Sequence, residues 1–352
     1  MSISQPKKTT PQIRSSTEFA RYVGLARTTV SRVLNGQPGL KPKTIERVRR
    51  AIEETGFVPN AYALHLKGKR TATIGICVEN LLTPPVVRKL AALQHQLREK
   101  NYTSLIEVIE AGHGDKVIRH FLSMRVEAVV FIGHFNEDEL TRHIAELVQR
   151  ETPHLIIDHF GIKGANTVTL DRPRAMQMVM DHLFDLGHRR FGLLAFNSQA
   201  RSVRDRLRAT QEALLARGLV LEQAIEMFDG AFPRTNDFEE GRRIARTAVE
   251  RGNLPTAFIA VNDEVAIGAM RGLQETGVRV PEDVSIAGFN NLDVCLMPTP
   301  ALTSVDQRIE ETVQLAVEAL LPQLGQPPAA KASVKMIEPL LVVRGSTAPA
   351  KT

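Results

Sequence analysis

The order of apolar and polar residues divides the chain into two parts. In the N-terminal part, apolar residues recur with helical spacing, as Ile45, Val48 and Ile52 do at positions i, i+3 and i+7. Gly56 follows this pattern and is placed to end the helix. In the longer remainder, short apolar runs alternate with amphipathic segments. The pattern therefore predicts a small helical domain followed by an α/β domain.

Two shorter helices joined by a tight turn are predicted ahead of that helix. Ser15 and Glu18 have the spacing of a capping box, and Gly24 can adopt the positive φ that a short turn needs. After the turn, one helical face is apolar and the opposite face is polar. The polar face comprises Arg27, Thr28, Ser31 and Arg32. The arrangement predicts a helix-turn-helix unit whose second helix can enter a major groove of DNA.

Positive charge is concentrated in the same N-terminal part. Residues 1–70 hold 14 Lys and Arg against 4 acidic residues, a net charge of +10, whereas the whole chain of 352 residues has +6. The remaining residues therefore carry a net charge of −4. Cations gathered on a patterned helical unit favour phosphate binding over a merely solvated charged surface.

The longer part of the chain consists of repeated strand and helix units. The expected strands are Thr73–Val78, Thr103–Ile109, Ala128–Ile132, Leu155–Asp158, Phe191–Phe196, Thr256–Val261 and Val284–Phe289. The expected helices are about Pro85–Lys100, Arg174–Leu186, Arg204–Ala216, Phe238–Arg251 and Glu264–Thr276. Repeated units of this kind predict doubly wound parallel sheets with helices on both faces.

An ordered series of motifs along the chain resembles the lac-repressor family of transcription regulators. The motifs are Thr29–Gly36, Thr44–Val48, Gly56–Ala63, Thr73–Ile76, Leu186–Arg190, Asn262–Ala269, Val280–Phe289 and Leu302–Val305. The resemblance implies a body of two lobes similar to a periplasmic sugar-binding protein, with the chain crossing between them near Thr169, Thr303 and Lys331. It also implies a homodimer that binds a pseudo-palindromic operator.

The patterns and the resemblance together place the domain boundaries. We expect a disordered arm (1–14), a helix-turn-helix domain (15–58), a hinge helix and linker (59–71), a two-lobed effector-binding and dimerisation body (72–345) and a tail (346–352). The tail has no leucine heptad, so we expect a dimer without a tetramerisation helix.

The resemblance also assigns DNA contacts outside the second helix of the head. Asn35 follows that helix directly, and residues 60–69 resemble the hinge helix of the family. In the family, a leucine at the position of Leu66 wedges between base pairs in the minor groove, with a small residue at the position of Ala63 beside it. The alternative is a linker helix whose leucines pack against the body.

Effector contacts are implied by the same resemblance, because ligand sites of such sheets lie at the carboxyl ends of strands and face the cleft between the lobes. Arg206 would bind ligand oxygens, the alternative being a solvated helix cation. Asp263 either belongs to the site or caps the helix that starts at Glu264. The expected effector-binding residues are Asp171, Arg206, Phe232, Asn262, Asp263 and Asn290.

The sequence departs from the family pattern at three places. Ala26 replaces the serine that caps the second helix, so the start of this helix should be weaker by about 1 kcal/mol. Residues 83–86 lack the two aromatic side chains common after the first strand. Asn290 replaces an aspartate. A neutral amide beside Arg206 favours an acidic effector, such as a uronate or a phosphorylated sugar, the alternative being the same binding of neutral hydroxyl groups.

Other functional classes lack their signatures. There is no nucleophile-elbow, zinc-protease, P-loop or dinucleotide-binding motif, and the ten histidines and two cysteines are scattered. We therefore expect no enzyme activity, catalytic residue, metal site or cofactor. No apolar run reaches about 18 residues and the N-terminus lacks a secretory signal, so we expect a cytoplasmic protein without a membrane segment. A transport-type solute-binding protein would need such a signal and would lack a basic head.

The sequence thus predicts a DNA-binding transcription regulator, more specifically a repressor. Its expected partners are double-stranded DNA, a second copy of the chain, and a sugar or sugar-derived effector that controls operator affinity. A regulator of the same fold that responds to a protein corepressor is the alternative.

Overall fold

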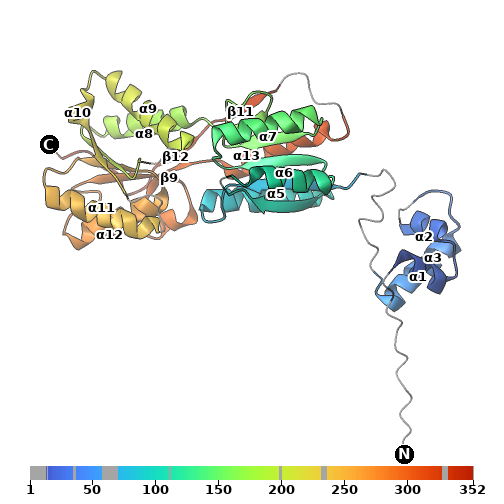
Figure 1. Cartoon of the computed structure of the whole chain (residues 1–352). Coiled ribbons are helices and arrows are strands. Elements are labelled where there is room, and N and C mark those ends of the chain that lie inside the picture. Colours follow the sequence, from blue (N-terminus) through green and yellow to red (C-terminus); the bar gives the residue numbers. More distant parts are fainter. Residues whose placement is uncertain are drawn as a thin grey trace, which may run out of the picture. The chain divides into compact units, whose positions relative to one another are not determined.

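The computed structural model divides the chain into two compact units, Met1–Thr71 and Ala72–Thr352. It describes residues 13, 15–34, 37–57, 70–110, 112–197, 200–230, 236–326 and 332–351 (Figure 1). The predicted hinge helix lies outside the described residues. So do four of the predicted site residues, Asn35, Ala63, Leu66 and Phe232. We call the described part of the first unit the head and the second unit the body.

The head consists of three helices. They are α1 (Ser16–Val23), α2 (Arg27–Leu34) and α3 (Pro42–Thr55). Their apolar faces meet in one small core, where the rings of Phe19 and Phe57 stack with centroids 4.2 Å apart. Val30 of α2 and Val48 of α3 are completely buried in this core. The opposite face of each helix is left to solvent.

Local sequence determines where these helices begin and end. The Ser15 hydroxyl accepts a hydrogen bond from the amide of Glu18 at 3.1 Å, which caps α1. Gly24 and Gly56 follow α1 and α3 in the left-handed region, with φ angles of 67° and 62°. The three helices and the glycine turn predicted for the head are confirmed.

The first lobe of the body is a six-stranded parallel sheet in the order β11-β5-β4-β3-β1-β2. Its strands are β1 (Thr73–Val78), β2 (Thr103–Val108), β3 (Ala128–Ile132), β4 (His154–Ile157), β5 (Asn166–Leu170) and β11 (Val334–Ile337). Its helices are α5 (Pro84–Glu99), α6 (Gly114–Ser123), α7 (Glu137–Gln149) and α13 (Ile309–Leu320). Alternate strand residues enter two cores, Ile76 on the side of α5 and Cys77 on the side of α6 and α7.

The second lobe contains the other six-stranded sheet, in the order β12-β10-β9-β8-β6-β7. Its strands are β6 (Phe191–Leu194), β7 (Ile225–Phe228), β8 (Ala257–Ala260), β9 (Ser285–Asn290), β10 (Thr303–Asp306) and β12 (Leu340–Val342). Its α-helices are α8 (Arg172–Asp185), α9 (Arg201–Leu215), α10 (Leu221–Ala224), α11 (Asp237–Arg251) and α12 (Asp263–Glu275). Strand β12 pairs antiparallel with β10, so the expectation of a wholly parallel sheet is wrong at this edge.

Helices α11 and α12 pack unusually close together because two glycines lie between them. A Cβ atom on Gly241 would be 2.1 Å from the Val265 carbonyl oxygen, and one on Gly268 would be 1.9 Å from that of Phe238. Any side chain at either position would push the helices apart. This pair covers one face of the second sheet (Figure 1).

The chain crosses between the lobes three times. It crosses at Asp171 between β5 and α8, at residues 307–308 between β10 and α13, and at residues 338–339 between β11 and β12. The first crossing lies near the predicted Thr169, and the second lies slightly after the predicted Thr303. The third is displaced from the predicted Lys331, because β11 still belongs to the first lobe.

The sequence patterns missed several elements. Strands β5, β7, β10, β11 and β12 and helices α6, α7, α10 and α13 were not predicted. Residues 346–351, which the sequence analysis set apart as a tail, hydrogen-bond to the second lobe through Ser346 and Ala350. Ser346 is completely buried, so these residues complete the lobe.

Candidate DNA-binding face and ligand site

The outer face of α2 carries the predicted recognition residues. Arg27, Thr28 and Arg32 are exposed, and Ser31 is half-buried. The Arg32 guanidinium donates to the Pro38 carbonyl at 3.2 Å, which orients it along the loop after α2. The face is polar and projects from a helix whose other side is held by the core. Its contacts with bases stay a prediction.

Helix α3 and the residue before it add a second set of exposed cations to the head. They are Lys41, Lys43, Arg47, Arg49 and Arg50. Arg50 pairs with Glu46 at 3.8 Å, but both side chains are exposed and such a pair contributes little. The cations of α2 and α3 together make a basic surface suited to the phosphates of nucleic acid.

Polar residues follow the carboxyl ends of the strands in both lobes. In the first lobe they are Glu79 after β1, His134 after β3, Asp158 and His159 after β4, and Asp171 and Arg172 after β5. In the second lobe they are Asn197 after β6, Asn262 after β8, Asn290 at the end of β9 and Gln307 after β10. In parallel sheets the carboxyl ends share one edge, which is where ligand sites form. We call these residues, with Lys89 of α5, the lobe junction.

Three charged side chains at the junction are almost completely buried. Lys89 donates to Asp158 at 2.5 Å, and Arg172 donates to the other oxygen of Asp158 at 3.3 Å and to the Thr169 hydroxyl at 2.9 Å. Their exposed fractions are 1%, 5% and 5% for Lys89, Asp158 and Arg172. We call these three side chains the ion cluster. It holds two cations and one carboxylate in a region removed from water.

The surroundings shift the pKa values of the junction acids in opposite directions. Burial alone would raise the pKa of Asp158, but the adjacent charges of Lys89 and Arg172 hold it at about 2. Burial raises the pKa of Glu79 to about 7, although its carboxylate accepts a hydrogen bond from the amide of His134 at 2.6 Å. Burial lowers the pKa of Lys89, and Asp158 partly offsets this effect. Glu79 is therefore the junction acid that changes charge near neutral pH.

Hydrogen bonds at the junction connect the two lobes. The Lys89 ammonium also donates to the Gln307 side-chain oxygen at 2.8 Å, and the Gln307 amide nitrogen donates to the Asn290 side-chain oxygen at 2.5 Å. A second connection runs from α9 to the first lobe. The Arg201 guanidinium lies 4.3 Å from the centre of the Phe160 ring and 3.5 Å from Glu137. Polar groups thus connect the two lobes at the junction.

Two histidines at the junction have buried nitrogen atoms without hydrogen-bond partners. Nδ1 of His134 and both ring nitrogens of His159 are unpaired in the described part of the chain. Burial lowers the pKa of each ring, and for His134 the charge of Arg172 adds to this effect. One carboxylate oxygen of Asp205 in α9 is also buried without a hydrogen-bond partner in the described part of the chain. Buried polar atoms of this kind are rare in proteins and often mark the place of a bound group.

Arg206 is not a solvated helix cation, so that alternative is wrong. It is 5% exposed and donates to the carbonyl oxygens of Ser202 at 3.1 Å and Val261 at 2.8 Å. Its guanidinium lies 4.3 Å from the centre of the Phe289 ring and 5.4 Å from that of Phe196. These contacts fix Arg206 at the strand ends of the second lobe.

Two other predicted effector residues, Asn262 and Asp263, have structural partners. Asn262, and not Asp263, caps α12, because it accepts from the amide of Val265 at 2.9 Å. Asp263 is completely buried and accepts hydrogen bonds from the Ser304 hydroxyl and the Leu292 amide. The capping role considered for Asp263 is therefore wrong.

Asp171 lies at the first crossing but caps α8. Its carboxylate accepts from the amide of Arg174 at 2.9 Å. The carboxylate of the ion cluster is supplied instead by Asp158, which the sequence analysis had placed at the end of a strand. A simple signal could have found it, because the first polar residue after an apolar strand lies at the ligand edge of a parallel sheet.

The comparisons with known proteins agree with this architecture. Residues 17–60 match "Bacterial regulatory proteins, lacI family", and residues 180–347 match "Periplasmic binding protein-like domain". The lactose operon repressor of Escherichia coli (strain K12) is 27% identical over 333 residues, which cover 94% of this chain and 89% of the relative.

Two solved structures are also similar. The crystal structure of the lac repressor dimer bound to operator and the anti-inducer ONPF has a TM-score of 0.85 at 25% identity, covering 96% of this chain and 100% of that one. A LacI family transcriptional regulator from Enterococcus faecium with bound ribose has a TM-score of 0.68 at 25% identity, covering 79% of this chain and 100% of that one.

A helix-turn-helix head with a two-lobed body of the periplasmic-binding-protein kind defines a class of DNA-binding transcription regulators. The basic face of α2 and α3 fits this class. The head matches the lacI family of bacterial regulatory proteins, and the chain is similar over most of its length to a repressor, which confirms the resemblance seen in the sequence. The relatives named above are transcription regulators and not enzymes.

Two features are absent from the described residues. None of the helices there is long and apolar enough to cross a membrane. The same residues contain no group of three or more His, Cys, Asp or Glu that could hold a metal ion.

Proposed function

We propose that this protein is a homodimeric transcription repressor whose operator affinity changes when a small effector binds between the lobes. The observation that carries the proposal is the ion cluster. Charged groups are costly to bury, and here they lie at strand ends, linked through Gln307 to the second lobe. Such an arrangement is suited to a site that responds to a polar ligand and is a poor way to stabilise a permanent interface.

Binding of DNA would use the head and the segment after it. Arg27, Thr28 and Arg32 would read the major groove, with Ser31 and Asn35 beside them. Leu66 would open a base step in the minor groove, with Ala63 beside it. Two heads of a dimer would then bind two half-sites of a pseudo-palindromic operator. The similar structure of a lac repressor dimer bound to operator supports this part of the proposal.

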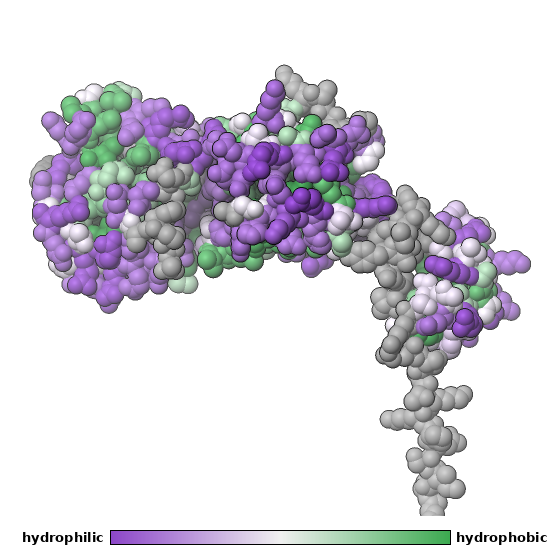
Figure 2. All heavy atoms as spheres, viewed as in Figure 1, coloured by the Kyte–Doolittle hydropathy of each residue, from purple (hydrophilic) through white to green (hydrophobic). Residues whose placement is uncertain are grey.

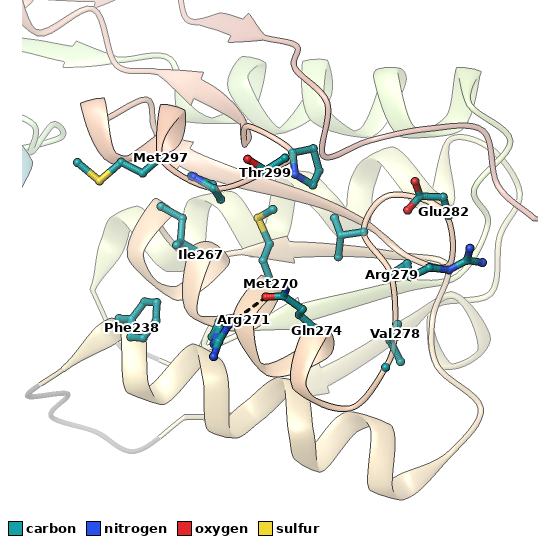
Figure 3. A pocket seen from close by; sticks show the side chains of 14 residues that line it. Phe238, Ile267, Met270, Arg271, Gln274, Val278, Arg279, Glu282, Met297 and Thr299 are labelled. Carbon is teal, nitrogen blue, oxygen red and sulfur yellow. Dashed lines mark hydrogen bonds between the residues drawn. The ribbon is translucent and has the colours of Figure 1, made fainter.

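Dimerisation is supported by exposed apolar residues on both lobes of the body. The mostly hydrophilic surface is interrupted by hydrophobic patches (Figure 2). Leu82 in the first lobe is 91% exposed, and Leu296 and Met297 in the second lobe are 67% and 77% exposed. Met297 borders a hollow of about 600 Å³ whose opposite wall is Ile267 and Met270 of α12 (Figure 3). A second copy of the chain would cover these residues.

An effector would act by changing the contacts between the lobes. It would compete for Lys89 at the ion cluster and alter the pairing of Arg201 with Glu137. The lobes would then shift, and with them the way in which two first lobes pair in the dimer. Because both heads must fit two half-sites at once, this change would alter operator affinity.

The proposal is tested by capturing genomic DNA fragments on the purified full-length protein and sequencing them, with and without a library of sugars and sugar acids. We expect one enriched pseudo-palindrome whose capture changes with at least one compound. A reporter gene placed downstream of that sequence should be transcribed less when the protein is present. Enrichment without symmetry, or a reporter that is activated, would contradict the proposal.

A further inference from the structure

The side-chain oxygens of the ion cluster and of its link to the second lobe already accept hydrogen bonds. Both oxygens of Asp158 already accept from Lys89 and Arg172. The side-chain oxygens of Gln307 and Asn290 are also occupied, by Lys89 and by the Gln307 amide respectively. A ligand that binds beside the ion cluster would therefore have to supply acceptors of its own, whereas among the described residues unpaired buried acceptor oxygens lie on Asn197 and Asp205.

The two junction histidines are placed to receive such a ligand. His134 follows β3 and His159 follows β4, which are neighbouring strands of the first sheet. His159 is 1% exposed, and neither of its ring nitrogens has a partner in the described chain. Buried imidazoles that serve only a structural role are normally hydrogen-bonded, as His154 is through both of its nitrogens. The unpaired ring of His159 and the unpaired Nδ1 of His134 thus point to a bound group.

The charges around the histidines favour an anion. His134 is in electrostatic range of Lys89, Arg172 and Asp158, and its backbone amide binds Glu79. His159 is in range of Arg172 and, across the junction, of Arg201, Asp205 and Glu137. In the first lobe, two buried cations face a single strong acid, because Glu79 holds its proton up to about pH 7. A negative group bound there would be attracted by the excess positive charge.

We propose that the effector is a small oxyanion, a carboxylate or a phosphate ester, whose charged group is bound by the imidazoles of His134 and His159 with uptake of one proton from solvent. This inference rests on the proposed function and names the ligand class of its site. The proton adds to a ring nitrogen, so that a ring that was neutral donates two charge-assisted hydrogen bonds. No covalent bond forms or breaks.

Uptake of a proton follows from the same charges. Burial lowers the pKa of both rings; nearby cations add to this effect, and at His159 the carboxylates of Glu137 and Asp205 oppose it. Both rings are therefore neutral at pH 7 in the protein alone. An oxyanion neutralises the cations that oppose protonation and accepts the new N–H donors. The affinity for the anion should therefore rise as the pH falls from 8 to about 6.

The test uses inorganic phosphate as the probe and histidine NMR as the readout. The full-length protein would be labelled at the ring carbon Cε1 of its ten histidines, and the spectrum recorded from pH 5.5 to 8.5 with phosphate or with chloride at equal ionic strength. His134→Gln and His159→Gln assign the two signals. Residues 15–57 contain no histidine, so phosphate bound to the head would not be mistaken for phosphate at the junction.

We expect phosphate to shift the signals of His134 and His159 and to raise their apparent pKa, and to leave His182 unchanged. His182 is the matched control, because it is also partly buried with a lowered pKa but pairs with Thr347 in the second lobe. The double His134→Gln/His159→Gln variant should bind phosphate about tenfold more weakly or worse, whereas His182→Gln should not. Unmoved signals at both junction histidines would overturn the proposal.

A second experiment distinguishes a carboxylate from a phosphate ester. It also distinguishes failure of this inference from failure of the proposed function. Calorimetry with glucose, glucuronate and glucose 6-phosphate, in two buffers of different ionisation heat, would show which compound binds with proton uptake. Glucuronate alone would identify a carboxylate, and glucose 6-phosphate alone a phosphate ester. Tight binding of glucose without proton uptake, together with altered operator affinity, would refute the anion and leave the proposed function standing.

Discussion

Replacement of Asp158 by asparagine should destabilise the body far more than replacement of Lys89 by methionine. In Asp158→Asn, the lone carboxylate of the ion cluster is lost, and two cations stay buried beside each other without a counter-charge. Breaking a buried ion pair in this way costs about 3–5 kcal/mol, and we expect about 4 kcal/mol here.

In Lys89→Met, one carboxylate, Asp158, and one cation, Arg172, remain in the ion cluster, so their charges balance. Asp158 keeps Arg172 at 3.3 Å, and the methionine side chain can pack with Leu90 and Leu93 on the apolar face of α5. The lost hydrogen bonds to Asp158 and Gln307 are offset by removal of a buried ammonium group. We expect a net loss of about 1 kcal/mol.

The two variants and the double variant would be compared by urea denaturation of the full-length protein, followed by circular dichroism. Glu338→Gln is the control, because the Glu338–Arg174 pair at the third crossing is exposed and should contribute less than about 0.5 kcal/mol. The free energy of unfolding of the double variant should fall by less than the sum of the two single decreases, since Arg172 is then the one charge left in the ion cluster. A larger loss for Lys89→Met than for Asp158→Asn would refute the reasoning.

Three further predictions concern pH and DNA. Because the native state holds the proton of Glu79 up to about pH 7 and the unfolded chain releases it near pH 4.5, the free energy of unfolding should fall as the pH rises between these values. Glu79→Gln should lessen this fall and stabilise the protein at pH 8 but not at pH 4.5 or below, as urea denaturation at the two pH values would show. Arg27→Ala should cost about 1–3 kcal/mol on the cognate operator and relax base preference, whereas Lys43→Ala should weaken all sequences alike; an unchanged preference profile of Arg27→Ala in a selection from random DNA would reject this role. Leu66→Ala should remove the operator bend and much of the specific affinity while non-specific binding persists, and gel-shift bend analysis with intact bending would favour the packing alternative.

The parts of the fold that could be predicted from sequence are those whose pattern is local. Strands β1 and β3 are short, mostly apolar runs. The helices of the head are predictable from the capping residue Ser15 and from Gly24 and Gly56, which follow helix ends. Strand β11 has alternating burial, and β12 is an apolar segment of only three residues. Each depends on pairing with a strand far away in the sequence. Local patterns carry no information on such partners.

The candidate site was predictable only in part for a similar reason. Motif resemblance led to Arg206 and Asn290, which the structure places at strand ends of the second lobe. It did not lead to Lys89, although a lysine on the apolar face of a helix is a signal of a buried charge. The partner that makes this burial possible, Asp158, follows β4, 69 residues further along the chain, and only the fold brings the two together.

The amide of Gln307 has a direction, since its oxygen faces the Lys89 ammonium and its nitrogen faces the Asn290 oxygen. One amide can satisfy both neighbours only while the first is a donor and the second is an acceptor. A mutation that replaced the Lys89 donor by an acceptor, or the Asn290 acceptor by a donor, would leave two acceptors or two donors facing each other at Gln307. Positions 89, 290 and 307 should therefore have changed together during evolution. A comparison of homologous sequences should show that these three positions covary.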